Sequence, residues 1–277
     1  MKHAIAAVIA LTTLSGAALA QAEAAPKAEA AQPVLKHHAP AAGAVVIRPG
    51  HPDLDVSRVQ PFVQDWRIAF PQEDGSVKYG ITLHNTLERI EGGTLWMFRS
   101  EMSMGGTEIF YEVVCDATTL AAVRQRQPDP KGDIEVVFEH GRIFGTIQRP
   151  EDAEPQELSI PIDGPMFQSS LASMVFGCLP LEIGYAASIP SVDFHESETG
   201  WMSIEVTALE PVTVYEGLVA DAYKVSVAQL GDTASVRWIT TDPAQQARFE
   251  FGAGGGGYWQ LIDPAELEAE AETAPEG

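Results

Sequence analysis

The stretch DIEVVFEHGRIFGTIQ, residues 133–148, sets the fold class of this chain. On each side of a short His-Gly turn, every second position is apolar or glycine. These positions are Ile134, Val136, Phe138, Ile143, Gly145 and Ile147. Two runs of period 2 around a two-residue turn that contains glycine are typical of a β-hairpin. The stretch therefore predicts two antiparallel strands, with Glu139 facing Arg142 across the turn.

The same alternation recurs in four more segments, residues 108–115, 201–208, 223–228 and 235–239. In the last of these, Val236 and Trp238 alternate with Ser235, Arg237 and Ile239. Successive side chains of a strand point to opposite faces of its sheet. These segments therefore predict long antiparallel strands with one wetter face, and a mainly β fold.

One segment breaks the alternation, DGPMFQSSLASMVFGCLPLE, which begins at Asp163. Its apolar side chains fall at helical spacing: Phe167, Leu171, Met174, Val175 and Cys178. Asp163 and Pro165 suit the first turn of a helix, whereas Gly177 and Pro180 favour its end. The segment predicts a helix over about residues 165–176. Because its apolar stripe needs a partner, we expect a strongly curved antiparallel sheet, a half-barrel, with this helix packed across its concave face.

After this helix the chain continues with an LP…G turn, a strand, and a T…G…A…V segment that leads into the next strand. The residues of these motifs are Leu179, Pro180, Gly184, Thr213, Gly217, Ala222 and Val225. This order resembles a periplasmic family of unknown function that is allied to the lipoprotein-localisation (LolA/LolB-like) half-barrel proteins. The resemblance covers residues 92–262 and implies a half-barrel with a helix in its concave side, a cavity that relatives use to shield lipid-like groups in transit through the periplasm. It brings no catalytic residues.

The first twenty residues have the three parts of an export signal. Lys2 and His3 precede the apolar run Ala4–Leu14, and small residues follow up to a cleavage site after Ala20. The apolar run is shorter than the roughly 20 residues that span a bilayer. We therefore expect a periplasmic protein whose mature chain begins at Gln21 and has no transmembrane segment.

The segments that flank the expected domain have no periodic apolar face. Residues 21–43 are rich in Ala and Pro, and residues 263–277 form an acidic tail, so both are expected to be disordered. Residues 44–262 are long enough for a single domain, although residues 45–91 have no pattern that predicts their fold. The formal net charge of −22 repels nucleic-acid phosphates and excludes nucleic acid as a partner.

Gly252, Gly254 and Gly257 match G-x-G-x-x-G, the fingerprint of a dinucleotide-binding loop. That loop needs a helix at its last glycine and an acidic residue about 20 residues later, within a βαβ unit. Tyr258–Ile262 has the aromatic and apolar composition of a strand, and the acidic tail follows it. We therefore expect a hairpin turn here and no nucleotide cofactor.

Residues that could carry chemistry are few. The chain has no G-x-S-x-G, H-E-x-x-H or C-x-x-C motif. Asp193, His195, Glu196 and Glu198 lie within six residues, but a strand presents two of them on each face, fewer than the three ligands of a catalytic zinc site. We read them as a solvated hairpin tip and expect no catalytic residues, no metal and no cofactor. A hydrolase that uses the His195 region is the alternative.

Cys115 and Cys178 are the only cysteines of the chain. An oxidising compartment favours a disulfide, which would tie the helix to the sheet. Two separate buried thiols are the alternative, because a free cysteine packs as a small apolar side chain. The sequence leaves both open.

Export, apolar strands and the lack of a catalytic set predict a non-enzymatic protein of the bacterial cell envelope that binds or shields a lipid-like or other apolar ligand. The ligand cavity is expected between helix and sheet, with Phe167, Leu171, Met174 and Val175 as candidate lining residues. The alternative is an envelope scaffold with a packed core, which binds a protein partner and no small molecule.

Overall fold

The computed structural model describes residues 40–104, 107–128, 132–139, 141–149, 152–194, 198–215, 217–228, 234–251 and 257–267. The expected export signal lies outside these ranges, as do residues 21–39 of the expected linker and residues 268–277 of the acidic tail. The described residues form fifteen strands, one seven-residue α-helix, three 3-10 helices and a short α-helical turn at residues 264–267.

The strands in chain order are β1 (Val45–Val46), β2 (Phe62–Pro71), β3 (Val77–Ile90), β4 (Leu95–Met104), β5 (Thr107–Asp116), β6 (Ala122–Gln127), β7 (Asp133–Glu139), β8 (Arg142–Gln148), β9 (Gln156–Pro161), β10 (Ala186–Asp193), β11 (Glu198–Tyr215), β12 (Leu218–Ala228), β13 (Ala234–Thr240), β14 (Gln246–Phe251) and β15 (Tyr258–Leu261). The helices are the 3-10 helices η1 (Val56–Arg58), η2 (Glu91–Gly93) and η3 (Ser169–Leu171), and α1 (Ala172–Cys178).

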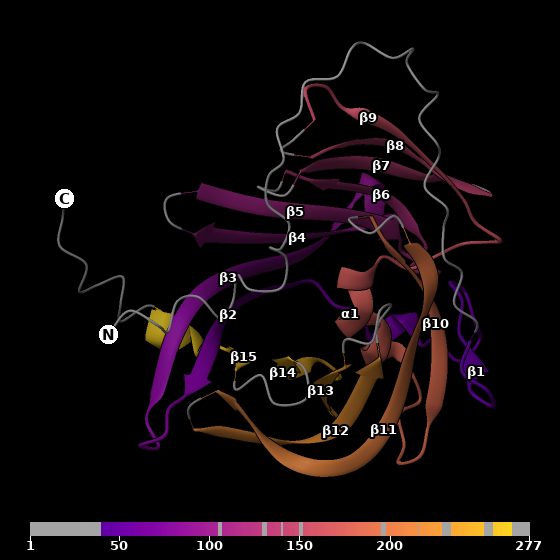
Figure 1. Cartoon of the computed structure of the whole chain (residues 1–277). Coiled ribbons are helices and arrows are strands. Elements are labelled where there is room, and N and C mark those ends of the chain that lie inside the picture. The colour runs from indigo at the N-terminus through magenta and orange to yellow at the C-terminus, as the bar shows by residue number, and fades with distance from the viewer. Residues whose placement is uncertain are drawn as a thin grey trace, which may run out of the picture. The chain divides into compact units, whose positions relative to one another are not determined.

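All fifteen strands of the described residues belong to one sheet, in the order β1-β10-β11-β12-β13-β14-β15-β2-β3-β4-β5-β6-β7-β8-β9. Apart from the short parallel pair β1–β10, neighbouring strands are antiparallel. The chain first forms β1 at one end of the sheet and then continues from β2, strand by strand, to β9 at the other end. It crosses over through α1 to β10 beside β1 and returns strand by strand to β15 beside β2. The sheet curls around α1 (Figure 1). The expected curved antiparallel sheet is confirmed.

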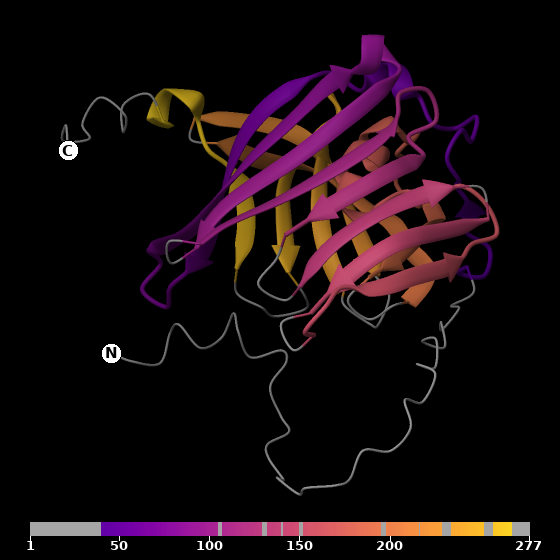
Figure 2. The ribbon, with the colours of Figure 1, turned by 90° about the horizontal axis from the view of Figure 1, so that it is seen from above.

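The curled sheet stays open, because β9 and β1 at its two ends do not pair with each other. The two halves of the sheet nevertheless meet through side chains: the rings of Phe138 on β7 and Phe194 after β10 lie edge to face, with centroids 6.1 Å apart. Val192 on β10 joins the same apolar cluster as the strands β7, β8 and β9. Figure 2 shows the magenta and pink strands of the first half lying over the orange and yellow strands of the second half.

The predicted hairpin of residues 133–148 is confirmed as β7 and β8. Glu139 pairs with Arg142, and one face of the hairpin buries the predicted apolar residues Ile134, Val136, Ile143 and Ile147. Gly145 has a φ of +153°, and a Cβ there would lie 2.0 Å from the carbonyl oxygen of Glu135. Only glycine fits at this close approach of two strands.

The predicted helix begins later than its sequence indicates. Residues 163–168 are not helical; η3 begins at Ser169 and α1 ends at Cys178. Gln168, not Asp163, caps the first turn, and the Asp163 carboxylate instead accepts hydrogen bonds from Arg48 at 2.8 and 3.1 Å. The carbonyl of Met166 also accepts from the backbone of Ala122 at 2.9 Å, which holds this segment against the start of β6.

The helix packs on the concave side of the sheet, within one buried cluster. Val175 and Phe176 on α1 lie in this cluster with Trp96, Val113 and Val225 from strands of both halves of the sheet. All five side chains are fully buried. The helix therefore fills part of the space that the curl of the sheet encloses, as its apolar stripe predicts.

Residues just outside the expected domain, residues 44–262, contact the sheet at both ends. At the start, the backbone N–H of Ala41 donates to the hydroxyl of Ser188 at 2.9 Å. At the end, residues 264–267 form a helical turn, and Glu266 pairs with Arg67 on β2. The first residues of the acidic tail thus have a cationic partner on the sheet.

The glycine run lies between β14 and β15, which pair antiparallel with Glu250 opposite Tyr258. A strand and not a helix follows it, so the hairpin interpretation is confirmed, although residues 252–256 themselves lie outside the described ranges. Asp193 and Glu198 also pair as the ends of a hairpin, β10–β11, while His195 and Glu196 lie outside the described residues.

Candidate functional site

A cavity of about 420 Å³ lies between α1 and the concave face of the sheet. Strands β2, β3 and β4 form one wall, α1 forms the second, and β13, β14 and the turn between them form the third. Exposed residues Arg58, Gln60, Pro61 and Pro243 also line it, so it reaches the surface between the η1–β2 segment and this turn. Its volume is within the range of about 300–1,000 Å³ that is usual for small-molecule sites.

Aromatic and aliphatic side chains cover much of the cavity wall. They are Val59, Phe62, Trp66, Leu83, Leu87, Phe98, Met174, Phe249 and Trp259. Strand register brings them together: Phe62 pairs with Leu87, and Leu87 pairs with Phe98, so the three share one face. The rings of Phe62 and Phe98 meet edge to face at 6.4 Å.

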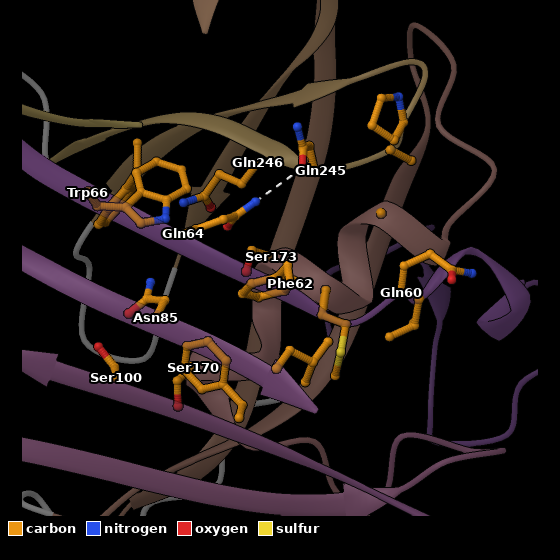
Figure 3. Close-up of a pocket in the computed structure, with 18 of the residues that line it drawn as sticks. Gln60, Phe62, Gln64, Trp66, Asn85, Ser100, Ser170, Ser173, Gln245 and Gln246 are labelled. Carbon is orange, nitrogen blue, oxygen red and sulfur yellow. Dashed lines mark hydrogen bonds between the residues drawn. The ribbon is translucent and has the colours of Figure 1, made fainter. Parts of the chain in front are cut away.

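Uncharged polar side chains stand between these apolar groups. Those labelled in Figure 3 are Gln60, Gln64, Asn85, Ser100, Ser170, Ser173, Gln245 and Gln246. Gln64 on β2 donates its Nε2 hydrogen to Oε1 of Gln245 at 3.1 Å, which joins the sheet to the β13–β14 turn (Figure 3). At the rim, Arg58 Nη1 donates to the carbonyl oxygen of Gly177 at 3.2 Å, which fixes the end of α1.

The polar corner of the cavity is organised around the side chain of Gln168. Its Oε1 accepts hydrogen bonds from the Tyr111 hydroxyl at 2.9 Å and from the Ser170 backbone N–H at 2.6 Å. The Ser170 hydroxyl donates to the same oxygen. Burial raises the pKa of Tyr111 above its usual range, so the phenol stays neutral at physiological pH. The buried side-chain amide of Gln168 thus caps η3 and positions Tyr111 on the cavity wall.

Arg237 on β13 is the buried charge of this cavity. Its side chain is 9% exposed, and Nη1 donates to Oε1 of Gln246 at 2.9 Å. The guanidinium carbon lies 4.6 Å from the ring centre of Phe249 and 5.6 Å from that of Phe176. Burial lowers the pKa of Arg237 to about 10, and Tyr111 opposes this change, so the guanidinium stays charged at neutral pH.

The lining is opposite in charge to the rest of the chain. The sequence has 39 acidic and 17 basic residues, yet the described residues that line the cavity include Arg58 and Arg237 and no Asp or Glu. Arg58 is neutralised in part by Asp55, whose Oδ2 is 3.7 Å from its Nε. A cavity of this composition favours an anion over a cation.

Of the four candidate lining residues, Met174 lies on the cavity wall. Phe167, Leu171 and Val175 are between 0% and 2% exposed and lie in the main apolar cluster, away from the lining. The helix presents its stripe to the packed core and only its edge to the cavity, because it sits deep inside the curl of the sheet.

Both cysteines are free thiols in the structure, and both are buried in the main apolar cluster. Burial is the main cause that raises the pKa of each to about 12. Asp116 and Cys178 raise the pKa of Cys115 further. Thiols with such pKa values are protonated at neutral pH and react slowly.

Of the remaining chemical candidates of the sequence, His195 and Glu196 lie outside the described residues. Within the described part of the chain, no three His, Cys, Asp or Glu side chains gather in a way that could hold a metal ion. No helix of the described residues has the length and hydropathy needed to cross a bilayer.

Sequence reasoning missed most of the lining. The η1–β2 segment had no readable pattern, and Arg237 was placed on the wetter face of its strand. One signal was present: Arg237 shares its face with Ile239, which is fully buried. A large apolar residue two positions from Arg237 in the same strand indicates that this face of the strand is not wholly exposed to solvent.

The fold and the site define a class of protein: an open, curled antiparallel sheet with a helix inside the curl and a side cavity with polar and apolar walls. The chain belongs to the DUF3108 family, described as a protein of unknown function, whose model matches residues 75–250, more than half of the chain. No curated protein and no solved structure matches it. The match adds no link to the lipoprotein-localisation proteins. It covers Arg237 and most of the cavity but leaves out β2 and β15.

Proposed function

We propose that this protein is an exported, non-enzymatic binding protein that holds a small apolar or lipid-like molecule in the cavity between α1 and the sheet. The observation that carries the proposal is the wall itself: three aligned apolar residues, Phe62, Leu87 and Phe98, face a cavity of about 420 Å³. Apolar walls with a few placed polar groups are typical of small-molecule sites.

The polar groups of the wall support binding rather than reaction. The described lining residues include no His, Asp or Glu that could activate a serine as a general base. The Ser170 hydroxyl donates to Gln168. This arrangement orients a ligand and supplies no proton acceptor of the usual kind.

The proposed setting is the bacterial periplasm. It rests on the export signal of residues 1–20 and on the resemblance to lipoprotein-localisation half-barrels, which is an analogy at the level of the fold. Protein recovered from the cell envelope should have the intact mass of a chain that begins at Gln21. A mature chain that keeps Met1 and Lys2 would contradict export by this route.

The binding proposal is tested by purification without detergent, followed by mass spectrometry of small molecules released on denaturation. The emptied protein is then titrated with N-phenylnaphthylamine, an uncharged fluorescent apolar probe. Ser100→Phe places a ring in the cavity wall on β4 and should weaken probe binding at least tenfold. Thr82→Phe, at an exposed position of β3, is the control and should bind as the unmodified protein does. The proposal fails if no small molecule co-purifies and the probe does not bind.

A scaffold function is the second candidate, and it is favoured by exposed apolar side chains of the β11–β12 hairpin. Leu209, Leu218 and Val219 are 47%, 41% and 61% exposed. Leu209 and Val219 lie on one face of this hairpin, on either side of the Pro211–Asp221 pair, and exposed apolar side chains on one face are a feature of protein-binding sites. If this function holds, changing Val219 to Asp should abolish co-purification of an envelope protein, and Ser100→Phe should leave it intact.

A further inference from the structure

The register of the strands places Arg237 in a row of concave-face residues. Val206, Val225, Arg237, Phe249 and Trp259 follow one another across β11 to β15 as paired residues. Val206 and Val225 are buried in the main cluster, and the last three line the cavity. The guanidinium of Arg237 therefore lies at the boundary between the packed core and the cavity.

Arg237 differs in its partners from four half-buried arginines of the described residues. Arg48, Arg67, Arg99 and Arg248 each have a carboxylate within 4 Å. No carboxylate of the described residues comes as close to Arg237, whose Nη1 reaches a neutral amide. Its Nε is buried without a hydrogen-bond partner in the described part of the chain, as are those of Arg67, Arg99 and Arg248, so the missing carboxylate is what distinguishes Arg237.

A buried cation without a counter-charge destabilises a fold, since its loss of hydration is not offset by attraction to an anion. The rings of Phe249 and Phe176 compensate in part through cation–π contacts. In a chain with more than twice as many acidic as basic residues, a carboxylate could readily have evolved beside it. A guanidinium that faces a cavity and has no carboxylate partner is instead suited to bind the oxyanion of a ligand.

We propose that the ligand of this cavity is an acidic amphiphile, whose carboxylate or phosphate group pairs with Arg237 while its apolar body lies against Phe62, Leu87 and Phe98. This inference rests on the proposed binding function and gives it a ligand class. Tyr111 and Ser170, which line the same cavity, are oriented by Gln168 and add hydroxyl groups to its polar side.

The first test uses ligands that share one chain and differ in the head group. Oleate and oleyl alcohol, and 1-oleoyl lysophosphatidic acid and monoolein, are compared in their displacement of N-phenylnaphthylamine from the unmodified protein. The anionic member of at least one pair should bind roughly 10- to 100-fold more tightly, the effect of one charge-assisted hydrogen bond or ion pair. The pair with the larger ratio identifies a carboxylate or a phosphate as the preferred group. Acetate and inorganic phosphate should not displace the probe, because they lack the apolar body.

The second test assigns this preference to one residue. Arg237→Gln should remove the preference for the anion, weakening its binding roughly 10- to 100-fold and that of oleyl alcohol less than threefold. Arg248→Gln on β14 makes the same change in net charge, but Arg248 lies outside the cavity lining and pairs with Glu250, so this control should keep the preference.

Stability of the empty protein separates a ligand-binding role from a structural one. Because Arg237 is a buried charge with no carboxylate partner among the described residues, Arg237→Met should leave the Tm of the ligand-free protein unchanged or raise it. A clear fall in Tm with no change in head-group preference would show that the residue serves the fold. Should the Met variant not fold, Arg237→Lys keeps the charge and should retain part of the preference.

The outcomes distinguish the two proposals. If neither member of a pair binds, the binding function itself is wrong. If the anionic and neutral members bind equally, the cavity binds apolar ligands and the inference about an acidic head group is overturned. If the preference persists in Arg237→Gln, the anion is held elsewhere, and the role of Arg237 is refuted.

Discussion

Two residues one helical turn apart provide a direct test of the cavity: Leu171 in the packed core and Met174 on the cavity wall. Leu171 is 1% exposed within the main apolar cluster. Met174 is half-buried and faces the empty space. Replacing each residue by alanine removes a side chain of similar size, and both changes affect helix propensity by a similar amount. The difference between the two variants therefore reports packing.

The magnitudes follow from what surrounds each side chain. Leu171→Ala leaves a new cavity in close-packed surroundings, which costs about 2.7–5 kcal/mol of the free energy of unfolding. Met174→Ala enlarges a space that already exists, so it loses contacts on one side and should cost about 1 kcal/mol. For a domain of this length, 1 kcal/mol corresponds to roughly 2–4 °C in Tm. We expect the Leu171 variant to melt roughly 5–20 °C lower and the Met174 variant roughly 2–4 °C lower.

The assay is thermal and urea unfolding of ligand-free protein, followed by far-ultraviolet circular dichroism. Equal m-values for the two variants and the parent would show that the same surface is exposed on unfolding in each case. Equal losses of 3 kcal/mol or more at both positions would refute the reasoning, because Met174 would then be as tightly packed as Leu171 and the cavity would be closed in solution.

Two further predictions concern the neighbours of the helix. A Cβ on Gly177 would lie 2.6 Å from the carbonyl oxygen of Ala244. Gly177→Ala should therefore lower the free energy of unfolding, measured by chemical denaturation, by about 1–3 kcal/mol. A gain of about 1 kcal/mol, which is normal for this change in a helix, would argue against the close approach of Gly177 and Ala244. Cys115 and Cys178 should resist a thiol reagent at pH 8 and both react after unfolding without reductant, whereas no reaction would indicate a disulfide. The pKa of each thiol is about 12 in the folded protein and about 8.5 in the unfolded chain. The contribution of the two thiols to stability should therefore be complete below about pH 8.5 and be lost as the pH rises toward 12.

The alternation of apolar residues was enough to predict the sheet and several strand faces. Val225 and Val227 on β12, like Ile204 and Val206 on β11, are buried as their spacing predicts. Local turn chemistry was also reliable, since it gave the β7–β8 hairpin with its Glu139–Arg142 pair. The strand faces and the hairpin depend on residues that are close together in the chain, so a single sequence is enough to predict them.

The start of the helix could not be predicted in the same way. Asp163 has the chemistry of a helix cap, but its carboxylate pairs with Arg48, which is 115 positions away in the chain. Gln168 caps η3 instead, and no local pattern reports the pairing of Asp163 with Arg48. Tertiary interactions commonly override such local preferences.

The cavity wall could not be predicted from the sequence for a related reason. On β13, Trp238 is 5% exposed and Arg237 on the opposite face is 9% exposed, so both faces of the strand are covered. Trp238 is buried in a cluster with Val212 and Val214 from the far end of β11. When both faces are buried, alternation no longer tells which side chains face the core and which face a ligand.

The pairing of β2 with β15 has a consequence for how the protein acquires its fold. Trp66 and Leu261 are direct partners, although 195 positions separate them, and their strands join the two half-sheets by backbone hydrogen bonds. Contacts so distant in sequence are associated with slow folding. Both strands lie outside the segment that matches the family, so that segment alone contains two half-sheets without the strands that link them. A chain cut short before residue 258 would lack β15 and would leave β14 and β2 unpaired in the middle of the sheet. The strand edges exposed in this way promote aggregation.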